Sequence, residues 1–298
     1  MTRPVQLLGS YWTLAVGAEP QGERLCPHDF RVRVEAAAKA GFTAMGFWHT
    51  DLIENRRKLG FREMKRILEG NGIHAIEVEW LLDWFCTDAR RVASDETRKL
   101  LLDAAEELGA SHIKIADLGN DGAGVPQMTE EFAVLCREAG ERGAKILFEM
   151  LPAAFSRVPS LDAVLAICIG SGATNGGIML DNLHLQRIGT PFEDIVRKIP
   201  RELPLGVEIN DGTLAMPVNF IDSVVNKRLL PGDGEFDIAA FLRAVWSRGY
   251  DGPIGVEVLN EYIRKWPLET AATEAFAKTT KVVAAAREQW AATQETIK

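Results

Sequence analysis

The chain has 298 residues, of which 47% are hydrophobic and 26% are charged, and its formal net charge at pH 7 is −8. This composition is typical of a globular protein with a full core, and the acidic balance argues against nucleic acid or an anionic membrane surface as a partner. No stretch is apolar over the length of a membrane span, and the N-terminus carries no long apolar segment, so we expect a cytoplasmic protein with no membrane partner.

Short apolar runs rich in Val, Ile and Phe alternate along the chain with longer segments of helical periodicity. The short runs predict strands and the longer segments predict helices. In chain order, the predicted strands cover 5–10, 44–49, 73–80, 112–117, 145–150, 177–181, 204–210 and 253–258. The predicted helices cover 29–41, 61–72, 94–110, 130–144, 161–170, 191–199, 237–249 and 268–290.

Several predicted helices end in glycine just before the next strand, at Gly41, Gly72, Gly143 and Gly249. Glycine is favoured there because the residue that follows a helix often takes a left-handed conformation. Eight strand–helix units without a linker-like stretch favour an α/β fold, a closed (β/α)8 TIM barrel with residues 1–298 as a single domain. An open doubly wound sheet is the alternative, but no GxGxxG sequence follows the first strand.

The four cysteines, Cys26, Cys86, Cys136 and Cys168, are scattered and form no CxxC pair. Two of them, Cys136 and Cys168, lie in apolar helical segments. Isolated cysteines in such segments usually pack as small apolar residues, so we expect buried, reduced thiols.

An acidic residue ends the apolar run of each of the last four predicted strands, namely Glu149, Asp181, Glu208 and Glu257. In a parallel barrel, catalytic side chains come from the carboxyl ends of the strands. Because side chains alternate along a strand, inward-facing acids place their bulky apolar neighbours against the helices. Gly206 and Gly255 would then also face inward and leave room near the acids, so we expect the four carboxylates to converge.

Four carboxylates in a poorly solvated barrel mouth would repel one another strongly. A divalent cation among them would offset this repulsion, and an all-oxygen ligand set favours Mg²⁺ or Mn²⁺ over Zn²⁺. The alternative is that the acids cap strands or pair with Lys and Arg. Four acids at matching depth on consecutive strands favour the metal site.

Two motifs resemble the xylose-isomerase-like barrel superfamily, which includes sugar isomerases, ketose 3-epimerases, inosose dehydratases, dehydroshikimate dehydratases and abasic-site endonucleases. The segment LDNLHLQRIG at 180–189 is similar to the family's LDxxH element. The segment RLLPGDGEFDIAAFLRAVWSRGYDGPIGVEV at 228–258 resembles its Arg–Pro–Gly–x–Gly, helix, Gly–Tyr–x–Gly and strand-eight Glu element. The first half of the chain resembles the family by its strand and helix pattern alone.

The resemblance implies one divalent metal ion held by four acids: Glu149, Asp181, Glu208 and Glu257. It implies that His184 hydrogen-bonds a substrate hydroxyl and that Arg228 binds a substrate oxygen or anion. It also implies that Glu149 and Glu257 move protons from opposite faces of the substrate. One position departs from the family pattern, because the strand-seven His of a His–x–x–Asp element is Glu208 here, with Asp211 kept. Glu208 is therefore either a metal ligand or a base.

Aromatic residues at or just after the first three predicted strands could line a pocket or pack loops: Trp12, Trp48, Trp80, Trp84 and Phe85. Of the residues in this region, Trp12 and His49 are our candidates for contact with substrate. Lys114 is disfavoured as an acid–base group, because it has the wrong strand parity if Asp117 faces inward. The remaining histidines, at positions 28, 74 and 112, are expected in structural or surface roles.

A metal site of this kind predicts removal of a proton next to a carbonyl through a metal-stabilised enediolate. Return of the proton gives our predicted function, a sugar isomerase or epimerase acting on a keto-sugar or polyol-type substrate. Loss of a β-oxygen gives the alternative, a dehydratase or lyase of the inosose, 3-keto-sugar or dehydroshikimate type. An endonuclease is disfavoured by the net charge and the single convincing site histidine, and a non-catalytic barrel by the four acids. The expected partner is a small sugar or cyclitol, and a homo-oligomer, dimer or tetramer, would fit the resemblance.

Overall fold

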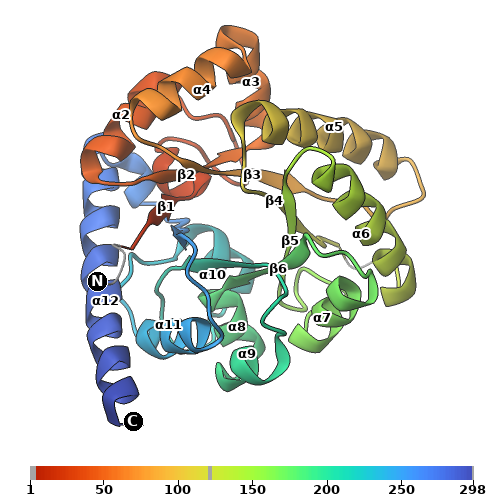
Figure 1. The fold of residues 1–298 in the computed structure, drawn as a ribbon. Helices are drawn as coiled ribbons and strands as arrows, with labels where there is room; N and C mark the ends of the chain where they lie inside the picture. The colour runs from red at the N-terminus through yellow and green to blue at the C-terminus, as the bar shows by residue number, and fades with distance from the viewer. Residues whose placement is uncertain (1–4, 120–122, 297–298) are drawn as a thin grey trace.

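The computed structural model describes residues 5–119 and 123–296, so the ends of the predicted domain, 1–4 and 297–298, lie outside the described residues. Eight parallel strands form a closed barrel in sequence order, with helices around the outside (Figure 1). The strands are β1 (Leu7–Gly9), β2 (Ala44–Trp48), β3 (Ala75–Leu81), β4 (His112–Ala116), β5 (Lys145–Glu149), β6 (Gly176–Asp181), β7 (Leu205–Ile209) and β8 (Ile254–Val256). The predicted (β/α)8 fold and all eight predicted strands are confirmed.

The longer helices of the described residues alternate with these strands and pack against their outer faces, and shorter helices lie in the loops at the carboxyl ends of the strands. They are α1 (Tyr11–Leu14), α2 (Phe30–Ala40), α3 (His49–Leu59), α4 (Phe61–Gly70), α5 (Arg90–Leu108), α6 (Val125–Gly140), α7 (Leu161–Gly170), α8 (Asn182–Ile188), α9 (Glu193–Lys198), α10 (Phe220–Asn226), α11 (Ile238–Ser247), the 3-10 turn η1 (Ile263–Lys265) and α12 (Leu268–Thr296). The long α12 lies against α2 and α11, and so joins the two ends of the helical ring (Figure 1).

Each predicted longer helix is present, and the glycines at 41, 72, 143 and 249 all have positive φ. The sequence did not predict α1, α3, α8 and α10, which all lie in loops that follow the carboxyl ends of strands. Most of these helices contain too few residues to show a helical period in their hydrophobic pattern. The start of α6 at Val125 is earlier than the predicted 130, with a proline in its first turn, where the fixed φ of proline suits a helix.

The side-chain alternation that the sequence predicts on the last strands is present. Ile146 and Phe148 are buried in the main core between strands and helices, so the intervening side chain of Leu147 points into the barrel. A Cβ on Gly206 would lie 2.5 Å from the Cε of Met179 and 2.7 Å from the Cδ1 of Leu147. Gly206 therefore gives space to inward-facing side chains below the acids instead of beside them. A Cβ on Gly255 would lie 2.8 Å from Cγ of Glu208, so Gly255 leaves room near an acid as the sequence predicts.

All four cysteines are free, with Cys26 half-buried and the other three buried. The expected reduced thiols are therefore present, although Cys26 is less buried than predicted. Within the described part of the chain, no helix combines the length and the apolar character needed to cross a membrane.

Candidate active site and metal centre

The four predicted carboxylates meet at the carboxyl-terminal mouth of the barrel. One oxygen from each of Glu149, Asp181, Glu208 and Glu257 lies within 4.8 Å of the others, and all four side chains are buried. Asp181 and Glu208 are direct partners in the strand register, whereas Glu149 is paired with Met179 and Glu208 with Gly255. Asp181 thus lies two residues beyond the partner of Glu149, and Glu257 lies two residues beyond the partner of Glu208. This shift in register is the stagger expected of tilted strands in a closed barrel.

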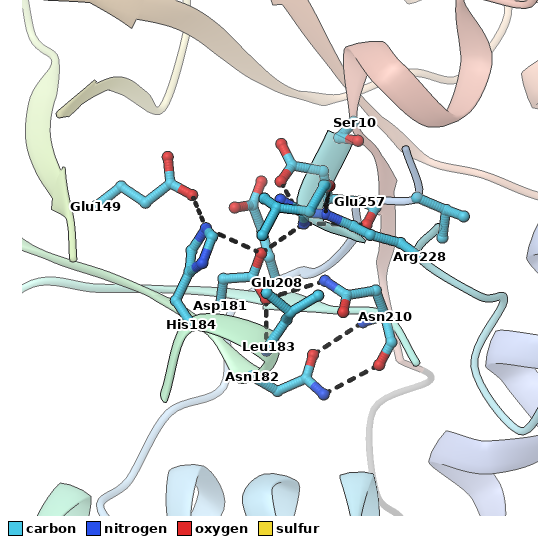
Figure 2. Close-up of polar contacts among 12 residues, drawn as sticks. Ser10, Glu149, Asp181, Asn182, Leu183, His184, Glu208, Asn210, Arg228 and Glu257 are labelled. Atoms are coloured by element: carbon cyan, nitrogen blue, oxygen red, sulfur yellow. Dashed lines mark hydrogen bonds and ion pairs between the residues drawn. The ribbon is translucent and has the colours of Figure 1, made fainter. Parts of the chain in front are cut away.

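Asp181 ends β6 and also caps the short helix α8, because its Oδ1 accepts a hydrogen bond from the backbone N–H of Leu183 at 2.8 Å. The same oxygen accepts from Nδ2 of Asn210 at 2.9 Å. Asn210 is held in turn by Asn182, whose side chain exchanges two hydrogen bonds with the Asn210 backbone (Figure 2). The ends of β6 and β7 are thereby joined, and the orientation of the Asp181 carboxylate is fixed.

Arg228 lies on the opposite side of this cluster from Glu149 (Figure 2). Its Nη1 donates to Oδ2 of Asp181 at 2.7 Å and to Oε2 of Glu257 at 2.9 Å, while its Nε donates to the carbonyl of Val224 at 2.8 Å. The guanidinium therefore orients two of the predicted metal ligands.

His184 projects from α8 toward the acids. Its Nε2 lies 3.3 Å from Oε1 of Glu149 and 3.7 Å from Oδ2 of Asp181 (Figure 2), and its Nδ1 is buried without a hydrogen-bond partner. The imidazole is therefore placed between Glu149 and Asp181, beside the predicted metal position.

Lys114 faces into the barrel, so the prediction that it has the wrong parity is wrong. Its Nζ lies 2.7 Å from Oε2 of Glu79, 2.8 Å from Oε1 of Glu208 and 2.9 Å from Oε1 of Glu257. Asp117, on which that prediction depended, lies beyond the end of β4 and accepts hydrogen bonds from Ser156 and the backbone of Arg157. The alternation in HIKIA contained the correct signal, since the isoleucines of β4 pack toward the helices.

The charges around Lys114 set the protonation states of its neighbours. Burial alone would lower the pKa of Lys114, but the carboxylates of Glu208, Glu257 and Glu79 raise it well above its usual value. Burial would raise the pKa of Glu257, but the charges of Lys114 and Arg228 hold it at about 2. Burial, which Lys114 only partly offsets, raises the pKa of Glu79 to about 8, and burial together with Glu257 raises that of Glu208. Lys114 and Arg228 therefore already offset part of the repulsion among the carboxylates, which the sequence suggested a metal ion would offset.

The four carboxylates still fit a divalent cation. Oxygens bound to one Mg²⁺ at about 2.1 Å lie roughly 3 to 4 Å apart, which is compatible with four ligand atoms within 4.8 Å. Oε2 of Glu208 is buried without a partner. Oδ1 of Asp181 already accepts two hydrogen bonds, but its Oδ2 accepts one, from Arg228, and so retains a second lone pair. Glu149, Asp181 and His184 form a second group of ligand atoms within the same distance.

A cavity of about 310 Å³ opens above this cluster. Glu149, Glu257, His184 and Arg228 are among the residues that line it, whereas Asp181 and Glu208 do not line it. Glu149 and Glu257 are therefore the two predicted metal-binding acids that a molecule in the cavity would meet.

A second cavity, of about 430 Å³, lies at the opposite end of the barrel and is lined by Glu77, Glu208 and His112, among others. Lys114, Glu79 and Glu257 line only the upper cavity, whereas Glu208, another partner of Lys114, lines only the lower one. This ionic cluster therefore lies between the two cavities. Glu208 faces this lower cavity, so its surroundings differ from those of the other three predicted ligands.

Of the other residues that the sequence placed near the pocket, some line the upper cavity and others pack in the core. Trp12 and His49 both line the upper cavity. His49 accepts a hydrogen bond at Nδ1 from the backbone N–H of Trp80 at 3.4 Å, and burial with the nearby Arg24 charge lowers its pKa to about 4. Trp84 is core instead, since its Nε1 donates to the carbonyl of Ala116 and its ring packs on buried aromatic residues.

His112, predicted to be structural or at the surface, pairs through Nε2 with Oε2 of Glu77 at 2.6 Å. Asp211, the kept residue of the strand-seven element, stays outside the carboxylate cluster. Its side chain accepts hydrogen bonds from the backbone N–H groups of Gly212, Gly232 and Phe236. It therefore orders the loop that follows Arg228, a role that the sequence analysis did not predict.

A closed parallel barrel with buried acids and a cavity at the carboxyl ends of its strands defines a (β/α)8 barrel with an enzyme-like site. The chain belongs to the xylose isomerase-like TIM barrel family, whose model matches residues 34–282. The family that the motifs suggested is thus confirmed.

Among curated relatives, a 3-dehydroshikimate dehydratase from Pseudomonas aeruginosa is 26% identical over 247 residues. The match covers 81% of this chain but 38% of the relative, so the chain spans well under half the length of that enzyme.

Two solved structures show the same fold at low identity. A crystal structure of IolI protein with a bound zinc atom has a TM-score of 0.79 and 18% identity, and covers 93% of this chain and 98% of that one. A D-allulose 3-epimerase from Methylomonas sp. in complex with D-allulose has a TM-score of 0.67 and 18% identity, and covers 95% of this chain and 98% of that one.

Proposed function

We propose that the protein is a divalent-metal-dependent enzyme that moves a proton on the carbon next to the carbonyl of a keto-sugar or keto-polyol, with isomerisation or epimerisation as the outcome. The observation that carries the proposal is that two of the four clustered carboxylates, Glu149 at the end of β5 and Glu257 just after β8, line the upper cavity. Two carboxylates in contact with one cavity can remove a proton and return it.

The ion, Mn²⁺ or Mg²⁺, would be held by Glu149, Asp181, Glu257 and Glu208. When bound, it would supply stabilisation of the negative charge that develops on the substrate oxygens. Glu257 and Glu149, the two acids of the cluster that line the cavity, would exchange the proton with the substrate carbon. His184 and Arg228 would hold substrate oxygens or orient the acids.

Dehydration is a second candidate, favoured by the similarity to a 3-dehydroshikimate dehydratase. It would begin with the same proton removal and would end with loss of a β-hydroxyl group. His49, which lines the cavity and carries its proton on Nε2 when Nδ1 accepts a hydrogen bond, would be a donor to the departing oxygen.

The test is a substrate panel of ketohexoses, inososes, 3-keto-glycosides and dehydroshikimate with Mn²⁺, followed by NMR in deuterated water. Isomerisation or epimerisation would introduce deuterium at the carbon next to the carbonyl without loss of water, and dehydration would give an unsaturated product. Glu149→Gln and Glu257→Gln should each lower kcat by at least 100-fold. The matched control is Glu141→Gln, an exposed acid, which should leave kcat unchanged. Unaltered rates in both site variants would refute the proposal.

A further inference from the structure

The walls of the upper cavity are much less polar than its acidic base. On one side lie the indole rings of Trp12, Trp48 and Trp80, with ring centroids 4.9 Å apart for Trp12 and Trp48 and 5.6 Å apart for Trp48 and Trp80. These residues lie just after β1 and at or near the carboxyl ends of β2 and β3. We call them the indole wall.

The other side is formed by aliphatic and phenyl side chains, which we call the aliphatic wall: Leu151, Phe155, Ile221, Val225 and Leu259. They come from the segments that follow β5, β7 and β8. Because β2 and β3 stand across a closed eight-stranded barrel from β6 and β7, the α10 residues Ile221 and Val225 lie across the cavity from the indole wall.

The two walls differ in the hydrogen bonds that their side chains can make. On the side of the indole wall, His49 lines the cavity and can hydrogen-bond a ligand, whereas the indole Nε1 groups of Trp48 and Trp80 are buried from it. The aliphatic wall has no side-chain donor or acceptor. A bare hexose, which carries hydroxyls on all sides, would lose hydrogen bonds to water along that wall, and each unreplaced bond weakens binding.

The aliphatic wall also continues to the rim, where Ile221 is 45% exposed. An exposed apolar rim that is continuous with an acidic base suits a ligand with one polar end and one apolar end. The cavity volume of about 310 Å³ falls within the range of about 300 to 1,000 Å³ found for sites that take drug-sized ligands.

We propose that the substrate is a keto-sugar or keto-cyclitol joined to a flat apolar ring, as in an aryl 3-keto-glycoside, with the ring held between the indole wall and the aliphatic wall. This inference rests on the proposed function for the polar end, which lies on the acids. The new element is the apolar ring, which defines the chemical class of the end of the substrate that lies away from the acids. Ring stacking on the indoles and burial against α10 supply the recognition.

The experiment compares phenyl and methyl forms of the same compounds. KM is measured on Mn²⁺-loaded protein with phenyl and methyl 3-keto-β-glucosides. Binding without turnover is measured on metal-free protein from the quenching of tryptophan fluorescence by phenyl and methyl β-glucosides. We expect the phenyl compound to show a KM and a Kd roughly 10- to 100-fold lower than the methyl compound.

Variants of the aliphatic wall make the test specific. Ile221→Ser and Val225→Ser should each reduce the methyl-to-phenyl ratio of KM, and that of Kd, several-fold. The matched control is Val218→Ser, because Val218 is fully exposed in the loop before α10 and does not line the cavity. This variant should leave the methyl-to-phenyl ratio of KM and the sedimentation coefficient unchanged.

The possible failures can be told apart. Equal KM values with normal turnover would overturn this inference and leave the proposed function intact. A lower Kd for the phenyl compound without turnover of any panel member would support the cavity assignment and contradict the proposed function. Wall variants that change the sedimentation coefficient but leave the methyl-to-phenyl ratio of KM intact would show that the aliphatic wall is a contact between subunits. That result would also overturn the inference.

Discussion

The ammonium group of Lys114 has three protons, and three different carboxylates, those of Glu79, Glu208 and Glu257, lie within 2.9 Å of its nitrogen. All of its donor capacity is therefore used inside the protein, and the side chain is only 1% exposed. A lysine held in this way serves as a fixed positive charge that orients the acids. It is poorly suited to attack a substrate carbonyl.

The variant Lys114→Met should test this role. Removal of one partner from a buried ionic cluster typically costs about 3–5 kcal/mol. Without the lysine charge, the buried carboxylates of the folded variant would have pKa values above those of the same groups in the unfolded chain. The folded state would then bind more protons than the unfolded state, so the free energy of unfolding should fall as pH rises. We expect a larger loss in urea unfolding at pH 8 than at pH 5.5. The control Lys99→Met, at an exposed helix position, should change stability by less than about 0.5 kcal/mol.

A loss that is the same at both pH values would mean that Lys114 contributes through packing instead of charge. The pH comparison therefore separates an electrostatic role from a purely structural one.

Among larger elements, the loop between β7 and α11 has the most influence on the site, because it carries Arg228 and the aliphatic residues of α10. Asp211 orders the part of this loop after Arg228 through three backbone hydrogen bonds, and its side chain is 1% exposed. A Cβ on Gly234 would lie 2.4 Å from Oδ1 of Asp211. Glycine is therefore required where the loop passes the carboxylate.

Asp211→Ala should destabilise the protein by about 3 kcal/mol or more, because it leaves backbone donors unsatisfied in a largely buried loop. The change should appear in urea unfolding, and limited proteolysis should show faster cleavage near 228–236. The comparison variant is Asp233→Ala, in the same loop, whose partner is the surface residue Lys278; it should cost less than about 1 kcal/mol. Equal effects in the two variants would contradict the ordering role of Asp211.

At the scale of the whole molecule, the proposed ligand set joins four consecutive strands, β5 to β8, through acids that span residues 149 to 257. An ion bound there would stabilise only the folded barrel, since the unfolded chain cannot bring these acids together. We expect Mn²⁺ at 100 times its Kd to add about 2.7 kcal/mol and to raise Tm by several degrees, as measured by calorimetry before and after treatment with a chelator. In Asp181→Asn this shift should be lost, and a shift that survives in this variant would place the ion elsewhere.

Much of this site could be predicted from local sequence. Side-chain alternation depends on neighbouring residues alone, so the inward orientation of Glu149, Asp181, Glu208 and Glu257 was available before any tertiary contact was known. Lys114 was open to the same argument and was missed because Asp117 was taken as the inward residue of β4. That acid lies beyond the strand, where alternation no longer applies.

By itself, the sequence determined the barrel, the order of its strands and the meeting of four acids at one end, because each follows from periodicity and from the closure rules of parallel strands. The tertiary structure alone decided that Lys114 neutralises part of that cluster, that Asp211 holds a loop, and that two unlike walls enclose the cavity. The physical reason is that these features depend on contacts between residues distant in the chain, such as Lys114 with Glu257, 143 residues apart, and Asp211 with Gly232, 21 residues apart. Local patterns contain no information on such contacts.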